Sequence, residues 1–499
     1  MREPTSSRRS PLAAAGLLAL LAACGGAPDG PVQPPGPAAQ GASRNLILVV
    51  VDTLRADRLG CYGHERDTSP NLDALAEESV LFENAFAPSP FTAASHASLF
   101  TSLYPDTHMV WNRATLENGA TVFPALSEKA VTLAEALRDA GFQTAGIADG
   151  GFVKAERGLD QGFQHFDSRT VGAADRFAEA VRWLEEERDP SRPFFLFLHT
   201  YEVHSPYMPE LEYVDRFDPD YRGPLREAVR QAREWVAANP EQNPINKPQE
   251  RFFKPLFDAA EFTARDKEYV KTLYDAEIAM VDDEMAGLVA HLRASGLLED
   301  TALVVTADHG EEFWEHDYWG HHKLWEETLR IPLIARLPDG PRGERRSDMI
   351  DLVDLMPSLL GELGVAVPET AAGRAVDLRD AAATPPGSYF VAQANSPFAI
   401  AVFRYAEGKT MFFVDPDEGV SVFDPAHDRA EREDLASTEA GQELIRRAKQ
   451  DRSEFARRSA ELRKRFQLFP ELRSQARFSP EMLAELEALG YIDSDEDDG

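Results

Sequence analysis

Short apolar runs rich in β-branched residues alternate along the chain with segments of helical periodicity. The expected strands are apolar on both faces, as in a parallel sheet that helices cover on each side. They comprise residues 46–51, 194–198, 303–306 and 331–335. The expected helices comprise residues 71–79, 132–140, 173–187 and 266–294. This order predicts an α/β fold with a mostly parallel sheet flanked by helices.

The pattern changes after about residue 365, where short strands separated by turn residues predict a smaller antiparallel sheet. These strands are expected at residues 388–391, 400–404 and 409–414. The resulting divisions are a large α/β domain over 44–365, a small C-terminal β subdomain over 366–437, and a helical extension with an acidic tail over 438–499. Residues 207–260, rich in Pro, Arg, Phe and Tyr, are expected to be loops that shape a crevice.

The N-terminus has the pattern of an export signal. Arginines precede an apolar stretch at 11–23, which is too short to span a bilayer comfortably. The stretch ends Leu-Ala-Ala-Cys-Gly, which resembles the lipobox of bacterial lipoproteins and implies a lipid on Cys24. We therefore expect a lipoprotein signal peptide over 1–23, a Pro/Gly-rich tether over 24–43, and a location in the bacterial cell envelope. A plain secretory signal is the alternative.

Charge and cysteine content narrow the classes of partner. The 52 Lys and Arg residues are outnumbered by 85 Asp and Glu residues, for a net charge of −33. This excludes a general nucleic-acid binder, because affinity for a phosphate backbone comes mainly from clustered cations. No later apolar run is long enough to span a membrane, so the lipid on Cys24 is the only expected membrane contact. Cys61 then has no partner, and stability must come from core burial.

Polar residues follow three of the expected strands directly. Asp52 follows the first, His204 lies a few residues beyond the second, and Asp308 and His309 follow the third. Ligands of open α/β sheets bind beyond the carboxyl ends of the strands, so these side chains are expected to meet in one crevice. Two carboxylates and one imidazole suit Mn²⁺ or Zn²⁺ and do not exclude Ca²⁺ or Mg²⁺.

Four ordered segments are informative when they are taken together. They read VVVDTLRADRLGCYG at 49–63, SPFTAASHASLFTSLYP at 89–105, HTYEVHSP at 199–206 and TADHGEEFWEHDYWGHHKLWEETLRIPL at 306–333. Together they resemble the sulfatase family of the alkaline phosphatase superfamily, from about residue 44 to residue 435. The resemblance implies an alkaline-phosphatase-like fold and a metal-dependent enzyme that cleaves sulfuric or phosphoric esters.

The resemblance also implies a metal centre. Asp52, Asp308, His309 and Thr92 are the expected ligands of one divalent ion (Mn, Zn, Ca or Mg). The family's first motif usually has two adjacent acids, whereas Thr53 replaces the second acid here. Acidic and imidazole groups between 308 and 322 leave a second metal ion open.

The residue at the nucleophile position decides between reaction types. Aligned with the sulfatase signature Cys-x-Pro-Ser-Arg, residues 92–96 read Thr-Ala-Ala-Ser-His. Thr92 cannot become formylglycine, because its Cβ carries a methyl group and oxidation would stop at a ketone. An unmodified hydroxyl nucleophile resembles the threonines of nucleotide pyrophosphatases, phosphonate monoester hydrolases and lipoteichoic-acid-type phosphoglycerol transferases. The alternatives are that Thr92 only caps the following helix, or that Ser95 is the nucleophile.

Further site residues are implied by the same resemblance. His204 and His321 match positions where the family places anion-contacting cations, and either could protonate a leaving oxygen. Ser95, His96, Lys154 and His322 are candidate substrate contacts, with His316 a weaker candidate.

These residues lead to three hypotheses about function. The first is cleavage of a phosphate monoester, diester or phosphonate, with hydrolysis or phospho-transfer as the outcome. The second is sulfate-ester hydrolysis at the same site, and the third is a non-catalytic lipoprotein that binds anions or glycans. The expected substrate is a small anionic ester, carried on a glycan or a lipid headgroup, since an acidic surface repels long polyanions.

Overall fold

The computed structural model describes residues 44–115, 121–239, 246–259, 262–383, 389–394, 399–413 and 419–474. The predicted signal peptide, Cys24 and tether, and the acidic end of the chain beyond residue 474, lie outside these ranges. Among the described helices, none combines the length and the apolar composition needed to cross a membrane.

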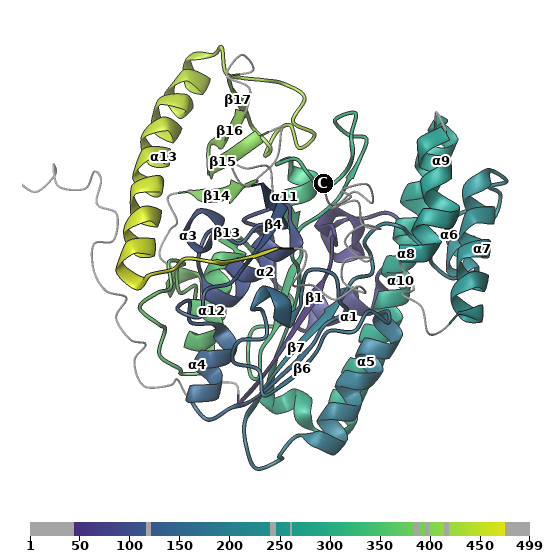
Figure 1. Cartoon of the computed structure of the whole chain (residues 1–499), viewed down its shortest axis with the longest axis horizontal. Coiled ribbons are helices and arrows are strands. Elements are labelled where there is room, and N and C mark those ends of the chain that lie inside the picture. The colour runs from purple at the N-terminus through teal and green to yellow at the C-terminus, as the bar shows by residue number, and fades with distance from the viewer. Residues whose placement is uncertain are drawn as a thin grey trace, which may run out of the picture. The chain divides into compact units, whose positions relative to one another are not determined.

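A nine-stranded, mostly parallel sheet forms the centre of the molecule (Figure 1). Its order is β11-β2-β12-β8-β1-β7-β5-β6, with β13 also paired to β2. The strands are β1 (Asn45–Val51), β2 (Val80–Phe86), β5 (Gln143–Ile147), β6 (His165–Asp167), β7 (Phe194–Thr200), β8 (Thr301–Ala307), β11 (Arg330–Ile331), β12 (Leu333–Arg336) and β13 (Glu344–Asp351). The predicted α/β class is confirmed.

The register of the three central strands positions the site. β1 lies between β7 and β8 and runs parallel to both. Val51 is level with Thr200 on one side and with Ala307 on the other. All seven residues of β1 are buried, which explains the uninterrupted apolar run from Leu46 to Val51. The residues that follow these strands therefore meet at one edge of the sheet.

The predicted strand 331–335 is divided in the structure. β11 and β12 are separated by Pro332, which has no amide hydrogen to donate to a neighbouring strand. The carbonyl of Pro332 accepts a hydrogen bond from the side-chain hydroxyl of Thr306 on the neighbouring strand β8. Both short strands run antiparallel to their neighbours β2 and β8, so this half of the sheet is mixed.

Two groups of helices flank the sheet (Figure 1). On one side α10 contacts α1, α5 and α6; on the other α2 contacts α12, α3 and α4. These helices are α1 (Pro70–Glu77), α2 (Thr92–Thr101), α3 (Pro105–His108), α4 (Leu133–Asp139), α5 (Ala173–Arg182), α6 (Leu211–Phe217), α10 (Ala264–Ala294) and α12 (Leu352–Glu362). The predicted helix 173–187 ends its regular part at Arg182 and continues as a π turn, Trp183–Glu187.

The expectation of loops over 207–260 is wrong. This region contains α6 and three further helices: α7 (Pro224–Ala238), α8 (Asn246–Pro248) and α9 (Lys254–Ala259). The longest, α7, begins with Pro224 at its first turn and buries Leu225, Ala228, Val229 and Ala232 on one face. Among the described prolines of this region, Pro224 begins α7 and Pro248 and Pro255 lie in helices, whereas Pro209 and Pro219 lie in the connecting segments.

The C-terminal part forms an antiparallel sheet in the order β14-β15-β16-β17. The strands are β14 (Phe390–Gln393), β15 (Ala399–Tyr405), β16 (Gly408–Phe413) and β17 (Val420–Phe423). Phe390 stacks on Phe86 of the large sheet, with ring centroids 5.0 Å apart. The charged helix is present as α13 (Glu439–Phe466), which contacts β16, β17 and α3.

Short strands complete the described structure. β3 (Ala114–Thr115), β4 (Thr121–Ala125) and β18 (Glu471–Ser474) form one small sheet, and β9 (Glu312–Phe313) pairs with β10 (Trp319–Gly320). The hairpin of β9 and β10 leads directly to His321 and then to the short helix α11 (Glu326–Leu329). Glu431 of the C-terminal part anchors this helix by accepting a bond from the backbone of Glu326. The two parts of the chain therefore meet close to a predicted site residue.

Candidate active site

Asp52, Asp308 and His309 form a buried cluster at the carboxyl ends of β1 and β8. One potential ligand atom from each residue lies within 4.8 Å of the others. All three residues are 0% exposed. Their proximity follows from the register, because each aspartate directly follows the last residue of its strand. The structure thus brings together the three residues that were predicted as metal ligands.

The cluster has the chemistry of a cation site. Both carboxylate oxygens of Asp52 and Oδ2 of Asp308 are buried without a hydrogen-bond donor. Burial, and then repulsion by Asp308 and Glu311, raises the pKa of Asp52. Burial raises the pKa of Asp308 to about 6. Unpartnered buried carboxylates are unfavourable, and a divalent cation bound among them would remove that penalty.

His309 presents its lone pair to the cluster. Its Nδ1 lies 3.0 Å from the carbonyl oxygen of Gly310, which can only accept, so Nδ1 carries the hydrogen. Nε2 is then the free acceptor that a metal ion requires. A backbone carbonyl on the far side of the ring is a common way of orienting such a ligand.

Thr53 supports the cluster through its backbone. Its N–H donates to Oδ1 of Asp308 at 3.1 Å, while its hydroxyl donates to the carbonyl of Val203 at 2.9 Å. Its φ of +52° is unusual for a β-branched residue and has an energetic cost. The hydroxyl is therefore directed to the backbone, and Thr53 does not replace the missing acid as a ligand.

Thr92 is the first residue of α2, and its hydroxyl faces the cluster. Oγ1 lies 3.4 Å from Nε2 of His309. The residue before it, Phe91, is the N-cap, and its side chain makes no capping hydrogen bond. The capping alternative for Thr92 is therefore wrong. The position also places the hydroxyl at a helix N-terminus, where anions are favoured.

His204 and His321 face each other beside the cluster. Their Nε2 atoms are 3.2 Å apart. Nδ1 of His204 donates to the carbonyl of Ser205, and Nδ1 of His321 donates to the carbonyl of Pro90. With both Nδ1 hydrogens engaged, a bond between the two Nε2 atoms requires one additional shared proton. The two imidazoles thus form a pair that can carry a single positive charge.

The pair is buried and lies against the cluster. The rings of His309 and His321 stack with centroids 4.5 Å apart. Burial lowers the pKa of His204 to about 3, and burial together with repulsion by His309 and His204 lowers the pKa of His321. Burial thus disfavours a positive charge on the pair, and a bound anion would favour its protonation.

The four candidate substrate contacts have different environments. Ser95 donates its hydroxyl to the backbone carbonyl of Asp308 at 2.6 Å. His96 is fully buried, with Nδ1 bonded to the carbonyl of Thr92. Nδ1 of His322 lies 2.6 Å from the hydroxyl oxygen of Tyr318. Lys154 lies in the segment after β5, just before the 3₁₀ turn Ala155–Arg157.

Two of these expectations change in the light of the geometry. The bonds of Ser95 and His96 hold the backbone around the site, which suits positioning better than direct substrate contact. His316 is also directed elsewhere, because its ring stacks on Trp325 at 3.8 Å and Nε2 lies 3.6 Å from Glu327.

Two residues that the sequence patterns did not indicate belong to the same region. His199, the sixth residue of β7, places Nε2 3.5 Å from Oδ2 of Asp52. Asn112 accepts a hydrogen bond from the backbone of Ala93 at the start of α2. The sequence does hold a signal for His199, since it is a histidine at the end of an otherwise apolar strand. Asn112 is in a loop and has no such signal.

The model of the sulfatase family matches residues 44–365, which is more than half of the chain. The chain belongs to the sulfatase family. Members of this family are hydrolases that generally bind a divalent metal ion, and the cluster of Asp52, Asp308 and His309 is the corresponding candidate. This sulfatase-family protein is therefore an ester hydrolase by family, and the reading as a non-catalytic lipoprotein is set aside.

Relatives of this sulfatase-family chain have more than one activity. An arylsulfatase of Clostridium perfringens is 25% identical over 393 residues, covering 66% of this chain and 76% of the relative. The multifunctional alkaline phosphatase superfamily protein PehA of Trinickia caryophylli is 25% identical over 402 residues, covering 67% and 76%.

Solved structures share the fold. BT4656 in complex with D-glucosamine-2-N,6-O-disulfate has a TM-score of 0.65 at 19% identity, covering 85% of this chain and 98% of that one. The phosphonate monoester hydrolase of Agrobacterium radiobacter has a TM-score of 0.60 at 20% identity, covering 87% and 97%. These likenesses confirm the alkaline-phosphatase-like architecture.

Removing one carboxylate should abolish metal binding. We expect Asp308→Asn to lose a stoichiometric divalent ion that the wild type retains after dialysis, measured by elemental analysis. Metal affinity of the wild type should also fall about ten-fold per pH unit below pH 6, because a proton competes for a carboxylate whose pKa is raised to about 6. Asp317→Asn, the same change at an exposed position of the following loop, is the control. Equal metal content in both variants would contradict the assignment.

Proposed function

We propose that this protein cleaves phosphate monoesters, phosphate diesters or phosphonates, with Thr92 as the nucleophile. The main support is the position of the Thr92 hydroxyl, an unmodified secondary alcohol. It lies 3.4 Å from Nε2 of His309, and Thr92 is the first residue of α2. Since a threonine cannot form the aldehyde used by formylglycine sulfatases, the hydroxyl itself must attack. Asp52, Asp308, His309 and Thr92 would hold the divalent ion, which would supply charge neutralisation for the anion and acidify the hydroxyl.

The reaction begins with attack of the Thr92 oxygen on phosphorus. The Oγ1–P bond forms as the bond from phosphorus to the leaving oxygen breaks, and the hydroxyl proton goes to solvent. A phosphothreonine results. Water then attacks phosphorus, the Oγ1–P bond breaks, and one proton of the water restores the Thr92 hydroxyl. The product is phosphate from a monoester, a phosphate monoester from a diester, and a free phosphonate from a phosphonate ester. A second alcohol in place of water would give phospho-transfer.

His321 and His204 would supply the proton that the leaving oxygen takes. The anionic substrate favours the singly protonated pair, and Nε2 of His321 or His204 can donate that proton as the ester bond breaks. The bonds to the carbonyls of Pro90 and Ser205 keep both rings oriented while the proton moves.

Sulfate-ester hydrolysis at the same site is the second candidate. It is favoured by similarity to an arylsulfatase and by the shared fold with a complex of a disulfated glucosamine. The phosphonate monoester hydrolases among the structural neighbours favour the first candidate. The substrate class that both candidates share is a small anionic ester, on a glycan or a lipid headgroup.

The nucleophile is tested by substitution at position 92. Thr92→Ala should lower kcat/KM for aryl phosphates, phosphodiesters and phosphonates by at least about 10³-fold, because no other hydroxyl occupies its place. Thr92→Ser should retain activity within about a hundred-fold. Thr101→Ala is the control. It removes another hydroxyl of α2, which bonds only to the Ala97 carbonyl, and it should leave kcat/KM unchanged.

The same assay separates the two candidates. Faster turnover of aryl sulfates than of any phosphorus ester would favour sulfate-ester hydrolysis as the reaction. Full activity of Thr92→Ala, or a trapped adduct on Ser95 in mass spectra of the reacted enzyme, would overturn the role of Thr92.

The proton donor has a distinct kinetic signature. His321→Gln should lower the rate of alkyl-ester cleavage by about 10²- to 10⁴-fold. The rate for 4-nitrophenyl esters should fall far less, since nitrophenolate leaves without taking up a proton. His291→Gln, near the end of α10, is the control. An equal loss for both leaving groups would show that His321 binds the anion without donating a proton.

We also propose that the protein is held in the bacterial cell envelope by a lipid on Cys24. The support is the sequence 21–25 after a short apolar stretch. In a bacterial host, Cys24→Ser should move the protein from the membrane fraction to the soluble fraction and abolish labelling by radioactive palmitate. Cys61→Ser, at the half-buried free thiol, should change neither. Membrane retention of Cys24→Ser would contradict the proposal.

A further inference from the structure

A cavity of about 620 Å³ lies where the edge of the large sheet meets the C-terminal sheet. Its walls include Asn84 of β2, Arg330 of β11, Met349 of β13 and Arg404 of β15. β2 is two strands from β8, which places this edge about 10 Å from the strand that ends at the metal cluster. The residues that line the cavity include none of the metal ligands, nor Thr92 or the histidine pair.

The cavity concentrates positive charge in an acidic protein. Four arginines line it, against two acidic residues; they are Arg330, Arg374, Arg404 and Arg429, with Glu326 and Asp348. Both acids already have partners, since Glu326 pairs with Arg404 and Asp348 pairs with Arg346. Arg374 pairs with Asp354. The chain as a whole has a net charge of −33, so an excess of cations at one place is unexpected.

Arg330 and Arg429 carry the excess. Neither forms an ion pair with a carboxylate within the described part of the chain. Arg330 donates from Nε and Nη2 to the backbone carbonyl of Glu83, and its guanidinium lies over the ring of Tyr62. Burial, and then repulsion by Arg429, lowers the pKa of Arg330. The two guanidinium groups therefore repel one another, and Glu326 and Asp57 attract Arg330 without forming an ion pair with it.

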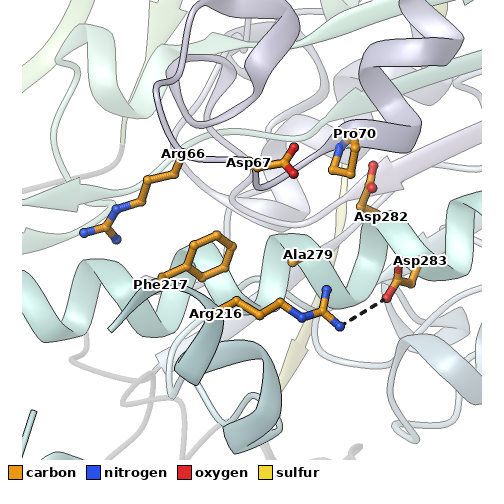
Figure 2. Close-up of a pocket in the computed structure, with 8 residues that line it drawn as sticks. All are labelled: Arg66, Asp67, Pro70, Arg216, Phe217, Ala279, Asp282 and Asp283. Carbon is orange, nitrogen blue, oxygen red and sulfur yellow. Dashed lines mark ion pairs between the residues drawn. The ribbon is translucent and has the colours of Figure 1, made fainter. Parts of the chain in front are cut away.

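A second cavity provides a contrast. It has a volume of about 420 Å³ and also contains two arginines, Arg66 and Arg216 (Figure 2). Arg66 pairs with Asp275 at 2.8 Å, and Arg216 points to Asp283 at 3.9 Å. Its lining also includes Asp67 and Asp282, so its cations are compensated by the protein itself. In the cavity between the two sheets, Arg374 and Arg404 are paired in the same way, whereas Arg330 and Arg429 form no ion pair among the described residues.

We propose that the cavity lined by Arg330 and Arg429 binds the phosphate or sulfate group of a small molecule. Guanidinium groups bind tetrahedral oxyanions through paired N–H donors, and the bond is strengthened by charge on both sides. His427 lines the same cavity; its Nδ1 is engaged by Asp424 at 2.7 Å, and its Nε2 is a further potential donor. The volume is in the range of small-molecule sites, so an anionic group with an attached sugar or alcohol also fits.

This site is independent of the reaction at Thr92. It shares no residue with the candidate active site, and anion binding there needs neither the metal ion nor turnover. The oxyanion could be the free product of the reaction or a second anionic group of the substrate. Both sources present the same chemistry to the arginines.

The test is a calorimetric titration of the metal-loaded, full-length protein with sodium sulfate and with inorganic phosphate at low ionic strength. We expect one class of anion site to weaken at least about ten-fold in Arg429→Glu, since an attractive charge is replaced by a repulsive one. Arg330→Gln should weaken the same class. Arg432→Glu makes the same charge change on the same loop at an exposed residue outside the cavity, and should leave affinity unchanged.

Kinetics with the same variants distinguish the two sources. If a second anionic group of the substrate binds in the cavity, Arg429→Glu should raise KM for a bis-anionic ester and leave KM for 4-nitrophenyl phosphate unchanged. If free product binds there, Arg429→Glu should weaken the noncompetitive part of inhibition by phosphate or sulfate. Identical titrations for Arg429→Glu and Arg432→Glu would overturn the proposal. Failure of the role of Thr92 would leave the titrations unaffected.

Discussion

Two fully buried carboxylates that lie close together are the constraint on which the rest of the site depends. The parallel register of β1 and β8 places Asp52 beside Asp308, and both side chains are fully buried. Such a pair is unfavourable unless a cation compensates it. The neighbouring groups fit that need: His309 offers a lone pair, and the backbone of Thr53 donates to Asp308. The stability of this region and the chemistry of the protein therefore have the same physical origin.

At two positions this chain has a residue other than the one usual in the family's motifs, and the contacts around the cluster of Asp52, Asp308 and His309 differ accordingly. Thr53, in place of an acid, bonds through its hydroxyl to the chain after β7 and leaves the cluster with fewer oxygen ligands. His96, in place of an arginine, is buried under Thr92 and holds its carbonyl. The positive groups that would contact an anion are then imidazoles, whose charge depends on the anion itself. These differences separate this site from one built around a modified cysteine and an arginine.

The C-terminal sheet has a structural part in the same arrangement. Lys409 of β16 is fully buried and pairs with Glu431, which in turn accepts a bond from the backbone of Glu326 at the start of α11. α11 follows the segment that carries His321, so contacts between the two parts of the chain restrict the position of one of the site histidines. The arginine-lined cavity occupies the remaining space between the two sheets.

The sequence by itself determined the class of fold and most of the site, because apolar strands and the residues directly after them are local patterns. Asp52, Asp308, His309 and Thr92 are recognisable in the chain alone, since each is next to a strand or a helix start. The tertiary structure alone decided which strands are neighbours, and hence that His199 of β7 lies beside Asp52. It also decided that the Pro-rich region 207–260 contains helices, and that His204 meets His321 across 117 residues of chain. Pairings of this kind depend on packing between distant segments, and no local pattern in the chain records them.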